Sequence, residues 1–400
     1  MSGSILTLNV GSSSMKFALF DIEPMSAILR GEITDLDTAP YLVARQSAGA
    51  EQTERHWPKG SDISFAAIVR DLLVFTQNHA GSAGFAAVGH RIVHGGPDHI
   101  TPARVTPELI ETLAALEPLD PLHLPNNLAP VRAIAAAHPS LPQVVCFDTA
   151  FHHTMPAVAQ AVALPAAFAS EGVRRYGFHG LSYEYVARHL ALAAPALARG
   201  RVIVAHLGAG ASLCALQGGV SIATTMGFSV LDGLVMATRC GNIDPGVILY
   251  LGRRGHSFAD IEDMLYHRSG LLGVSGISGD MRVLLASDDP AARAAIDLFT
   301  YRIATEAAGL ACALGGIDAL VFTAGIGTHS PVIRANICAR LEWLGLRLDD
   351  AANESDVSRI SAPDSRIEVR TIATDEEEMI AHHTRAITRA DAPGSRAPHQ

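Results

Sequence analysis

The stretch ILTLNVGSSSMKFALFD, residues 5–21, decides the fold of this 400-residue chain. Its apolar run breaks at Asn9-Val10-Gly11, passes three serines, and resumes after Lys16, a pattern that predicts strand, tight turn and strand. Gly11 tolerates a positive φ, and the hydroxyls of Ser12 and its two serine neighbours add to the loop amides, so the turn can present several donors to one anion. Lys16 adds a positive charge on the outgoing strand. An ordinary β-hairpin has the same composition, because Gly and Ser are common turn residues.

The pattern returns about half a chain later, at VIVAHLGAGASLCALQG, residues 202–218. An ungapped alignment of Gly11 with Gly208 places Asn9 beside His206 and Ala18 beside Ala215. Repetition of one unit at this scale indicates a duplicated fold rather than two unrelated turns.

A third glycine turn, Gly325–His329, follows an apolar run from Ala319 and then enters a helix. Ser330 suits the N-cap of that helix and Pro331 its first position. The helix start would offer free amides and a positive dipole end to an anion. Two hairpins and a strand-glycine-helix turn therefore predict a duplicated α/β fold with a nucleotide bound between the halves.

Other segments have plain local signals. Residues 64–79 have helical periodicity, and Thr106-Pro107 begins a capped helix. Thr374 is the expected N-cap of a helix over 375–389, with Glu377 in the capping-box position. The tail from Asp391 is expected to be disordered.

Two charged residues lie where predicted strands end. Arg91 lies in GHRIVHGG, a strand that runs into a Gly-Gly loop, and Asp148 ends the apolar strand QVVCFD. In α/β proteins ligands bind at the carboxyl ends of strands, so both are candidate site residues. A solvated arginine beside a turn and an Asx-turn are the ordinary alternatives.

Composition narrows the class of protein. The net charge of −10 and the lack of any basic run argue against nucleic-acid binding. Five widely spaced cysteines without a C-x-x-C pair predict a reduced cytoplasmic protein, and no apolar run is long enough to span a membrane. His90 and His94 lie in a strand context, where residues four apart are too distant to share a metal ion, so we reject a zinc site.

Eight motifs in order, LNVGSSSMKF, GHRIVHGG, FDTAFHHTMP, YGFHGLS, HLGAGAS, TTMGF…GLVMATRCGNIDPG, TAGIGTHS and TDEEEMIA, resemble the acetate kinase (acetokinase) family. They span essentially the whole chain. The resemblance implies a duplicated ribonuclease H-like (actin-like ATPase) α/β fold, with two lobes and a central interdomain cleft. It implies a first lobe of residues 1–149 with 377–400, and a second, nucleotide-binding lobe of residues 150–376.

The resemblance also assigns roles. It implies Asp148, His179 and Arg239 as catalytic residues, with Asn9 and Glu376 associated with Mg²⁺, or with Mn²⁺ as the alternative metal. The implied acceptor site consists of Arg91, His123, Val93, Leu122, Phe178 and Val230. The implied ATP/ADP site consists of Ser12, Lys16, His206, Leu207, Gly208, Ala209, Gly210, Asp280, Met281, Arg282, Gly325, Ile326, Gly327, Thr328 and His329.

The chain departs from the family pattern at four places. Leu181-Ser182-Tyr183 stands where Thr-Ser-His is usual, which we expect to affect helix capping more than chemistry. Ala209 replaces an asparagine, so backbone donors must suffice there. Val230 replaces a proline of the pocket for the substrate methyl group, and one methylene alters discrimination by only about 1–3 kcal/mol. Gly-Thr-His at 327–329 replaces Gly-Glu-Asn, so adenosine contacts should be mainly backbone.

The expected reaction is direct and reversible: acetate and ATP give acetyl phosphate and ADP. A carboxylate with a pKa of about 4 to 5 is already a nucleophile at neutral pH, so no general base is needed. The difficulty is charge repulsion, which cationic groups must offset. The alternatives are a propionate or butyrate kinase, a sugar kinase, and an ATP-dependent switch of the actin or chaperone type. The family implies a homodimer.

Overall fold

The computed structural model describes residues 3–11, 13–47, 49, 52–57, 63–355 and 357–390. Ser12 and the tail from Asp391 lie outside these ranges. The chain divides into two compact units: unit 1 is Met1–Ala150 with Asp375–Gln400, and unit 2 is Phe151–Thr374.

In the described part of unit 1, eight strands form one sheet in the order β5-β4-β3-β2-β1-β6-β8-β7. The strands are β1 Ser4–Val10, β2 Met15–Asp21, β3 Ser26–Thr34, β4 Tyr41–Gln46, β5 Gln52–His56, β6 Phe85–Ile92, β7 Ala103–Arg104 and β8 Gln143–Phe147. The helices are α1 Phe65–Gln77, α2 Pro107–Ala114, α3 Leu124–Ala137 and α16 Glu376–Ala390. Ser64 and Thr106 cap α1 and α2 as predicted.

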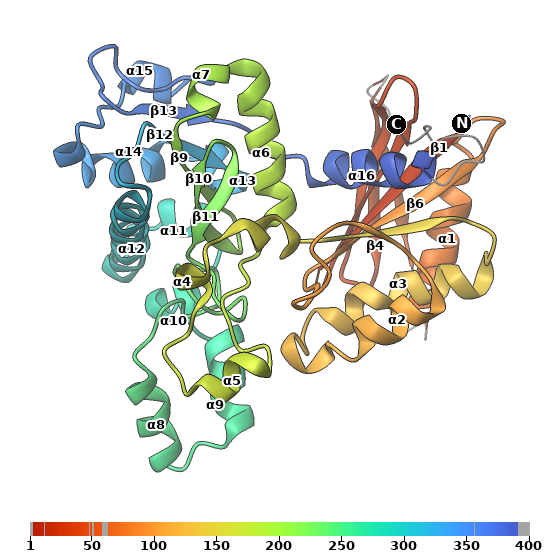
Figure 1. Cartoon of the computed structure of the whole chain (residues 1–400), viewed down its shortest axis with the longest axis horizontal. Helices are drawn as coiled ribbons and strands as arrows, with labels where there is room; N and C mark the ends of the chain where they lie inside the picture. The colour runs from red at the N-terminus through yellow and green to blue at the C-terminus, as the bar shows by residue number, and fades with distance from the viewer. Residues whose placement is uncertain are drawn as a thin grey trace, which may run out of the picture. The chain divides into compact units, whose positions relative to one another are not determined.

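Both faces of β1 are buried, and they meet different helices. Leu6, Leu8 and Val10 belong to the core that includes residues of α1 and α3, whereas Ile5 packs in a second cluster with Ala381 of α16. Because side chains alternate along a strand, Asn9 lies on the α16 face. Figure 1 shows α16 running along the sheet of unit 1 beside β1 and β6.

In the described part of unit 2, five strands form a sheet in the order β11-β10-β9-β12-β13. The strands are β9 Arg201–Leu207, β10 Ala211–Gln217, β11 Val220–Thr224, β12 Ala319–Thr323 and β13 Glu368–Thr371. The helices are α4 Ala157–Gln160, α5 Ala166–Ser170, α6 Gly180–Ala193, α7 Pro195–Ala198, α8 Pro245–Arg253, α9 Phe258–His267, α10 Gly270–Ser275, α11 Met281–Leu285, α12 Pro290–Leu314, α13 Ala324–His329, α14 Pro331–Ala339 and α15 Asp350–Asn353.

The two sheets share one topology, which confirms the predicted duplication. In each, an antiparallel hairpin is flanked by a third antiparallel strand on one side and by two parallel strands on the other. The order β3-β2-β1-β6-β8 of unit 1 therefore repeats as β11-β10-β9-β12-β13 in unit 2.

The ungapped alignment of the two hairpins is wrong beyond the turn. Val10 pairs with Met15 in the first hairpin, but Leu207 pairs with Ala211 in the second, so the second loop is one residue shorter. Ala18 therefore corresponds to Cys214, not to Ala215. The one-residue difference also decides which face of the sheet each side chain of β10 occupies, because a shift by one residue moves every following side chain to the opposite face.

Two further local predictions are corrected. Residues 325–329 are not a turn but part of the short helix α13, which directly follows β12; Pro331 nevertheless begins α14 as expected. The N-cap of α16 is not Thr374, because the Asp375 carboxylate accepts from the Glu378 amide at 2.9 Å. A bidentate contact from Arg30 also holds Asp375 in place.

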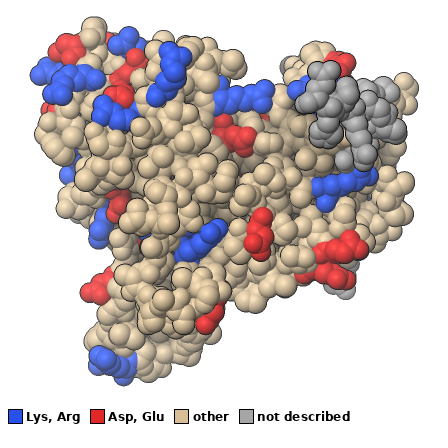
Figure 2. Space-filling view, in the orientation of Figure 1, with Lys and Arg blue, Asp and Glu red and all other residues tan. Residues whose placement is uncertain are grey.

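The surface has mixed charge. On the face shown in Figure 2, Lys and Arg are interspersed with Asp and Glu. Every helix in the described ranges is too short or too polar to traverse a lipid bilayer. All five cysteines are free thiols.

Candidate functional site

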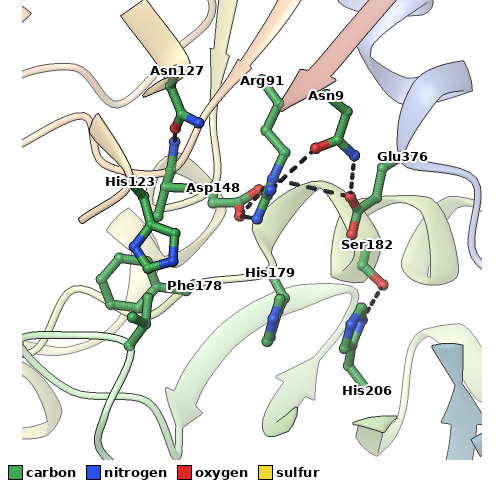
Figure 3. A network of polar contacts seen from close by, with 12 residues as sticks. Asn9, Arg91, His123, Asn127, Asp148, Phe178, His179, Ser182, His206 and Glu376 are labelled. Atoms are coloured by element: carbon green, nitrogen blue, oxygen red, sulfur yellow. Dashed lines mark hydrogen bonds and ion pairs between the residues drawn. The ribbon is translucent and has the colours of Figure 1, made fainter. Parts of the chain in front are cut away.

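Polar side chains from the ends of three strands and the start of one helix meet in unit 1. We call them the Arg91 cluster: Asn9, Arg91, Asp148, Glu376 and Glu377. Arg91 donates from Nε and Nη2 to Asp148 Oδ2 at 3.0 and 2.5 Å, and from Nη1 to Asn9 Oδ1 at 3.1 Å. Asn9 Nδ2 in turn donates to Glu376 Oε2 at 2.9 Å and Glu377 Oε1 at 3.1 Å. Figure 3 shows Arg91 between Asn9 and Asp148, with the Glu376 carboxylate joined to both Asn9 and Arg91.

The sheet topology of unit 1 explains this convergence. β1, β6 and β8 are parallel neighbours, so Asn9, Arg91 and Asp148 emerge at the same edge of the sheet. The Asp148 amide donates to Ile92 O at 3.0 Å, which extends the backbone pairing of β6 and β8 as far as Asp148. α16 begins at Glu376 against this edge.

The charges in the cluster shift the pKa values of its members. Burial disfavours the charge of Arg91, but Asp148 and then Glu376 outweigh it and raise the pKa of Arg91 above its ordinary value. Burial, followed by the nearby charge of Glu376, raises the pKa of Glu377, although Lys16 and Asn9 act in the opposite sense. Lys16 is exposed and lies opposite Asn9 in the β1–β2 register. The cluster is therefore a buried ion pair bordered by two adjacent carboxylates.

Asn127 of α3 fixes two loop ends of unit 1. Its Oδ1 accepts from the Val93 amide and its Nδ2 donates to Val10 O, both at 2.8 Å, so it ties the end of β1 to the chain leaving β6. His123, the N-cap residue of α3, contacts Asp120 through Nδ1 at 2.9 Å. Val93 is buried and Leu122 is half-buried. Sequence reasoning missed Asn127, because its signal is only an amide in a polar loop-to-helix segment.

In unit 2 two imidazoles are stacked, those of His179 and His206, with centroids 4.1 Å apart and planes at 10°. His206 Nδ1 contacts Ser182 Oγ at 2.8 Å, and His179 Nδ1 contacts Ser212 Oγ at 2.8 Å. The hydroxyl of Tyr183 lies 2.5 Å from the same Ser212 oxygen. The expectation that the departure at residues 181–183 concerns helix capping is wrong, because α6 has no side-chain cap and Tyr183 bonds in this network instead.

His179 has a left-handed backbone, with φ of 58°, which is uncommon for a residue other than glycine. Its neighbours hold it there: His152 Nε2 contacts Phe178 O at 2.9 Å, and the Tyr183 amide donates to His179 O at 3.1 Å. His152 is fully buried, and burial lowers its pKa to about 4, so it is neutral at pH 7. Gly177 is required beside it, since a Cβ there would lie 2.7 Å from the His152 ring. Phe178 itself is buried in the core.

The turn between β9 and β10 lies against both His179 and Arg239. A Cβ on Gly210 would lie 3.2 Å from His179 Nε2 and 4.0 Å from Arg239 Nη1. Arg239 Nη1 donates to the carbonyl of buried Val230 at 3.4 Å. The structure thus brings two predicted site residues of unit 2, His179 and Arg239, to Gly210.

A cavity of about 740 Å³ in unit 2 opens beside the same turn. Eight of the predicted nucleotide residues line it: Gly208, Ala209, Asp280, Met281, Arg282, Gly325, Ile326 and His329. Gly279, Leu285, Ala237 and Ser330 complete the lining, which is largely apolar and suited in size to a planar ring system. His206, Leu207, Gly210, Gly327 and Thr328 do not line it. The carbonyls of Gly327 and Thr328 accept instead from the buried Arg334, at 3.1 and 2.6 Å.

The Arg91 cluster contains oxygen donors of the kind that bind a divalent cation. In the described part of the chain, no three His, Cys, Asp or Glu side chains are placed to enclose a metal ion directly. Glu376 and Glu377 are nevertheless adjacent carboxylates whose repulsion a cation would relieve, and Mg²⁺ commonly binds through one or two carboxylates plus water and phosphate. These residues fit an Mg²⁺ ion that retains water ligands.

The chain is similar to known carboxylate kinases over nearly its whole length. Residues 4–382 match the Acetokinase family. The acetate kinase of Rhodopseudomonas palustris is 53% identical over 391 residues, covering 96% of this chain and 98% of the relative. The solved propionate kinase of Francisella tularensis is 37% identical, with a TM-score of 0.88 over 96% of this chain and 99% of that one. Porphyromonas gingivalis acetate kinase is 34% identical, with a TM-score of 0.86 over 96% and 100%.

Proposed function

Because the chain belongs to the acetokinase family, we infer that it is an acetate kinase, a phosphotransferase with a carboxyl acceptor and the duplicated actin-like ATPase fold. It transfers the γ-phosphoryl group of ATP to acetate, and the same site carries the reverse transfer from acetyl phosphate to ADP. We propose that the transfer is a direct in-line attack by the acetate oxygen.

The pairing of Asp148 with Arg91 is the observation that carries the mechanism. A kinase acting on a hydroxyl requires a carboxylate to take up its proton. The buried Asp148 carboxylate instead accepts two hydrogen bonds from Arg91, at 3.0 and 2.5 Å. A carboxylate held in this way orients a guanidinium rather than accepting a proton from substrate. An acceptor that is already an anion needs an oriented cation and no base.

The roles of the remaining residues follow from charge. Arg91 and His123 bind the acceptor carboxylate. The family resemblance assigns contacts with its methyl group to Val93, Leu122, Phe178 and Val230. Arg239 and His179 stabilise the charge of the transferring phosphoryl group, as electrostatic stabilisers do in transfer reactions.

The nucleotide occupies the 740 Å³ cavity of unit 2, with the glycine turn at residues 208–210 near its phosphates. The family resemblance assigns Lys16 of unit 1 to the same ligand. Asn9 and Glu376 would hold Mg²⁺ through water, and the ion would neutralise phosphate charge. We further propose a cytoplasmic homodimer, in keeping with the family resemblance and the five free thiols.

A hydroxamate assay with acetate, propionate and butyrate tests the function. With Mg²⁺, ATP and hydroxylamine, the purified protein should convert acetate to acetyl hydroxamate. Its kcat/KM should be higher for acetate than for propionate or butyrate. A higher kcat/KM for propionate would instead make the chain a propionate kinase, like its Francisella relative, with Val230 as the first residue to exchange. ATP hydrolysis that no carboxylate stimulates would contradict the kinase function and favour a switch protein.

A further inference from the structure

Two consecutive residues of α6 reach the two stacked imidazoles. Ser182 contacts His206 Nδ1 directly, whereas Tyr183 reaches His179 Nδ1 through the hydroxyl of Ser212. Ser212 and Tyr183 are both fully buried. The spacing is fixed by the hairpin register, because Ser212 pairs with His206 across the β9–β10 ladder and so lies on the α6 face.

The chain of hydroxyls has a preferred direction. A phenol is a stronger acid than an aliphatic alcohol, so Tyr183 is the better donor of the pair. If Tyr183 donates to Ser212 Oγ, the single serine proton points to His179 Nδ1. That nitrogen then accepts, and the ring proton of neutral His179 lies on Nε2. Nε2 is the atom next to Gly210, beside Arg239.

We propose that Tyr183 is a positioning residue that, through Ser212, holds His179 in the tautomer with the proton on Nε2. A neutral imidazole in this tautomer presents an N–H donor at the glycine turn, where an acceptor oxygen of the phosphoryl group would bind. This proposal rests on the proposed function for its purpose, although the tautomer itself is a property of the protein alone.

The environment of the Tyr183 ring supports a purpose beyond packing. Its ring packs edge-on against His152 and His206, with ring centroids 5.6 and 6.3 Å away, so the phenol oxygen is held in place beside Ser212 Oγ. If the Tyr183 ring only filled space, phenylalanine would serve equally well, because no hydrogen bond would be lost. The contact between the Tyr183 hydroxyl and Ser212 shows that a bond is made. The family pattern has histidine at this position, so the Tyr183 hydroxyl in this network is a departure from that pattern.

The first test is spectroscopic and needs no change in the relay. Nitrogen-15 shifts of histidine-labelled protein distinguish the two tautomers, and His179 is assigned from the signal lost in His179→Gln. We expect a proton on Nε2 and a bare Nδ1. A signal with the proton on Nδ1 would overturn the proposal.

The second test is a double-mutant cycle with Tyr183→Phe, Ser212→Ala and the double variant. We expect kcat to fall about 10-fold in Ser212→Ala and several-fold in Tyr183→Phe, with KM for ATP within about twofold, because only the placement of one donor changes. The double variant should be no slower than Ser212→Ala, and Tyr183→Phe should mix the His179 tautomers. Tyr185→Phe, on the same helix and half-buried, is the control and should leave kcat unchanged.

Losses that multiply in the double variant, or a Tyr183→Phe enzyme that matches Tyr185→Phe, would refute the relay. Failure of the wild-type protein to phosphorylate any carboxylate would refute the proposed function alone. In that case the nitrogen-15 spectra would still decide the tautomer.

Discussion

Replacing Asp148 by Asn should destabilise unit 1 by about 3 kcal/mol, because it leaves a buried guanidinium without its main counter-ion. The side chains of Asp148 and Arg91 are 0% and 15% exposed, and their closest atoms are 2.5 Å apart. With charge centres about 4 Å apart and an effective dielectric constant of about 20, the attraction is about 4 kcal/mol. Glu376 lies 4.0 Å from Arg91 Nε and retains part of it. Breaking a buried pair typically costs about 3–5 kcal/mol.

Thermal and urea unfolding measure this loss directly. A loss of 3 kcal/mol corresponds to a fall in Tm of about 6–12 °C for a domain of this size. The matched control is Glu117→Gln, whose pair with Arg132 spans 3.6 Å between side chains that are 38% and 46% exposed. Its effect should stay below about 1 kcal/mol. The double variant Asp148→Asn/Arg91→Met should recover stability, since it removes the unpaired charge.

The reasoning would be refuted by an Asp148→Asn protein whose Tm falls no further than that of Glu117→Gln. It would equally fail if Arg91→Met worsened the single variant. Either result would mean that water or another group solvates Arg91 as well as Asp148 does.

Arg239→Ala should lower kcat about 10²-fold or more in the hydroxamate assay, because it removes a charge stabiliser beside Gly210; near-unchanged turnover would reject its assignment. Acid should weaken both units, since burial lowers the pKa of His90 and of His152 from 6.5 to about 4. The neutral folded form is favoured above pH 6.5, and that stability is lost as pH falls from 6.5 to about 4, by about 1.4 kcal/mol per pH unit and histidine. Urea titrations at several pH values should show a shallower loss for His152→Gln than for the wild-type protein.

The fold was largely predictable because its signals are local. The apolar alternation around Gly11 and Gly208, and the caps at Ser64 and Thr106, depend on neighbours in sequence. The one-residue difference between the hairpin loops was not predictable. The first loop is rich in glycine and serine and the second in glycine and alanine, and a loop of either length can close a hairpin. The N-cap of α16 is Asp375 rather than the predicted Thr374 because both residue types suit an N-cap, so the local sequence does not choose between adjacent candidates.

Site residues were predictable where a charged residue follows an apolar strand. They were not predictable where a polar residue contacts the site from a helix that is distant in sequence. Arg91 and Asp148 follow apolar strands, so their convergence follows from parallel pairing. Asn127 and Tyr183 lie within helices, and nothing in their local sequence indicates that one ties two strand ends and the other bonds to Ser212. Such contacts depend on which helix covers which face of a sheet.

The return of α16 to unit 1 has a consequence for biosynthesis. The ribosome makes β1 to β8 first, yet the helix that covers Ile5, Ala18 and Phe20 is translated only after the whole of unit 2. Unit 2 can therefore complete its fold while the earlier-made half still exposes an apolar sheet face. The nascent chain should need chaperone protection at its beginning until its last helix is released.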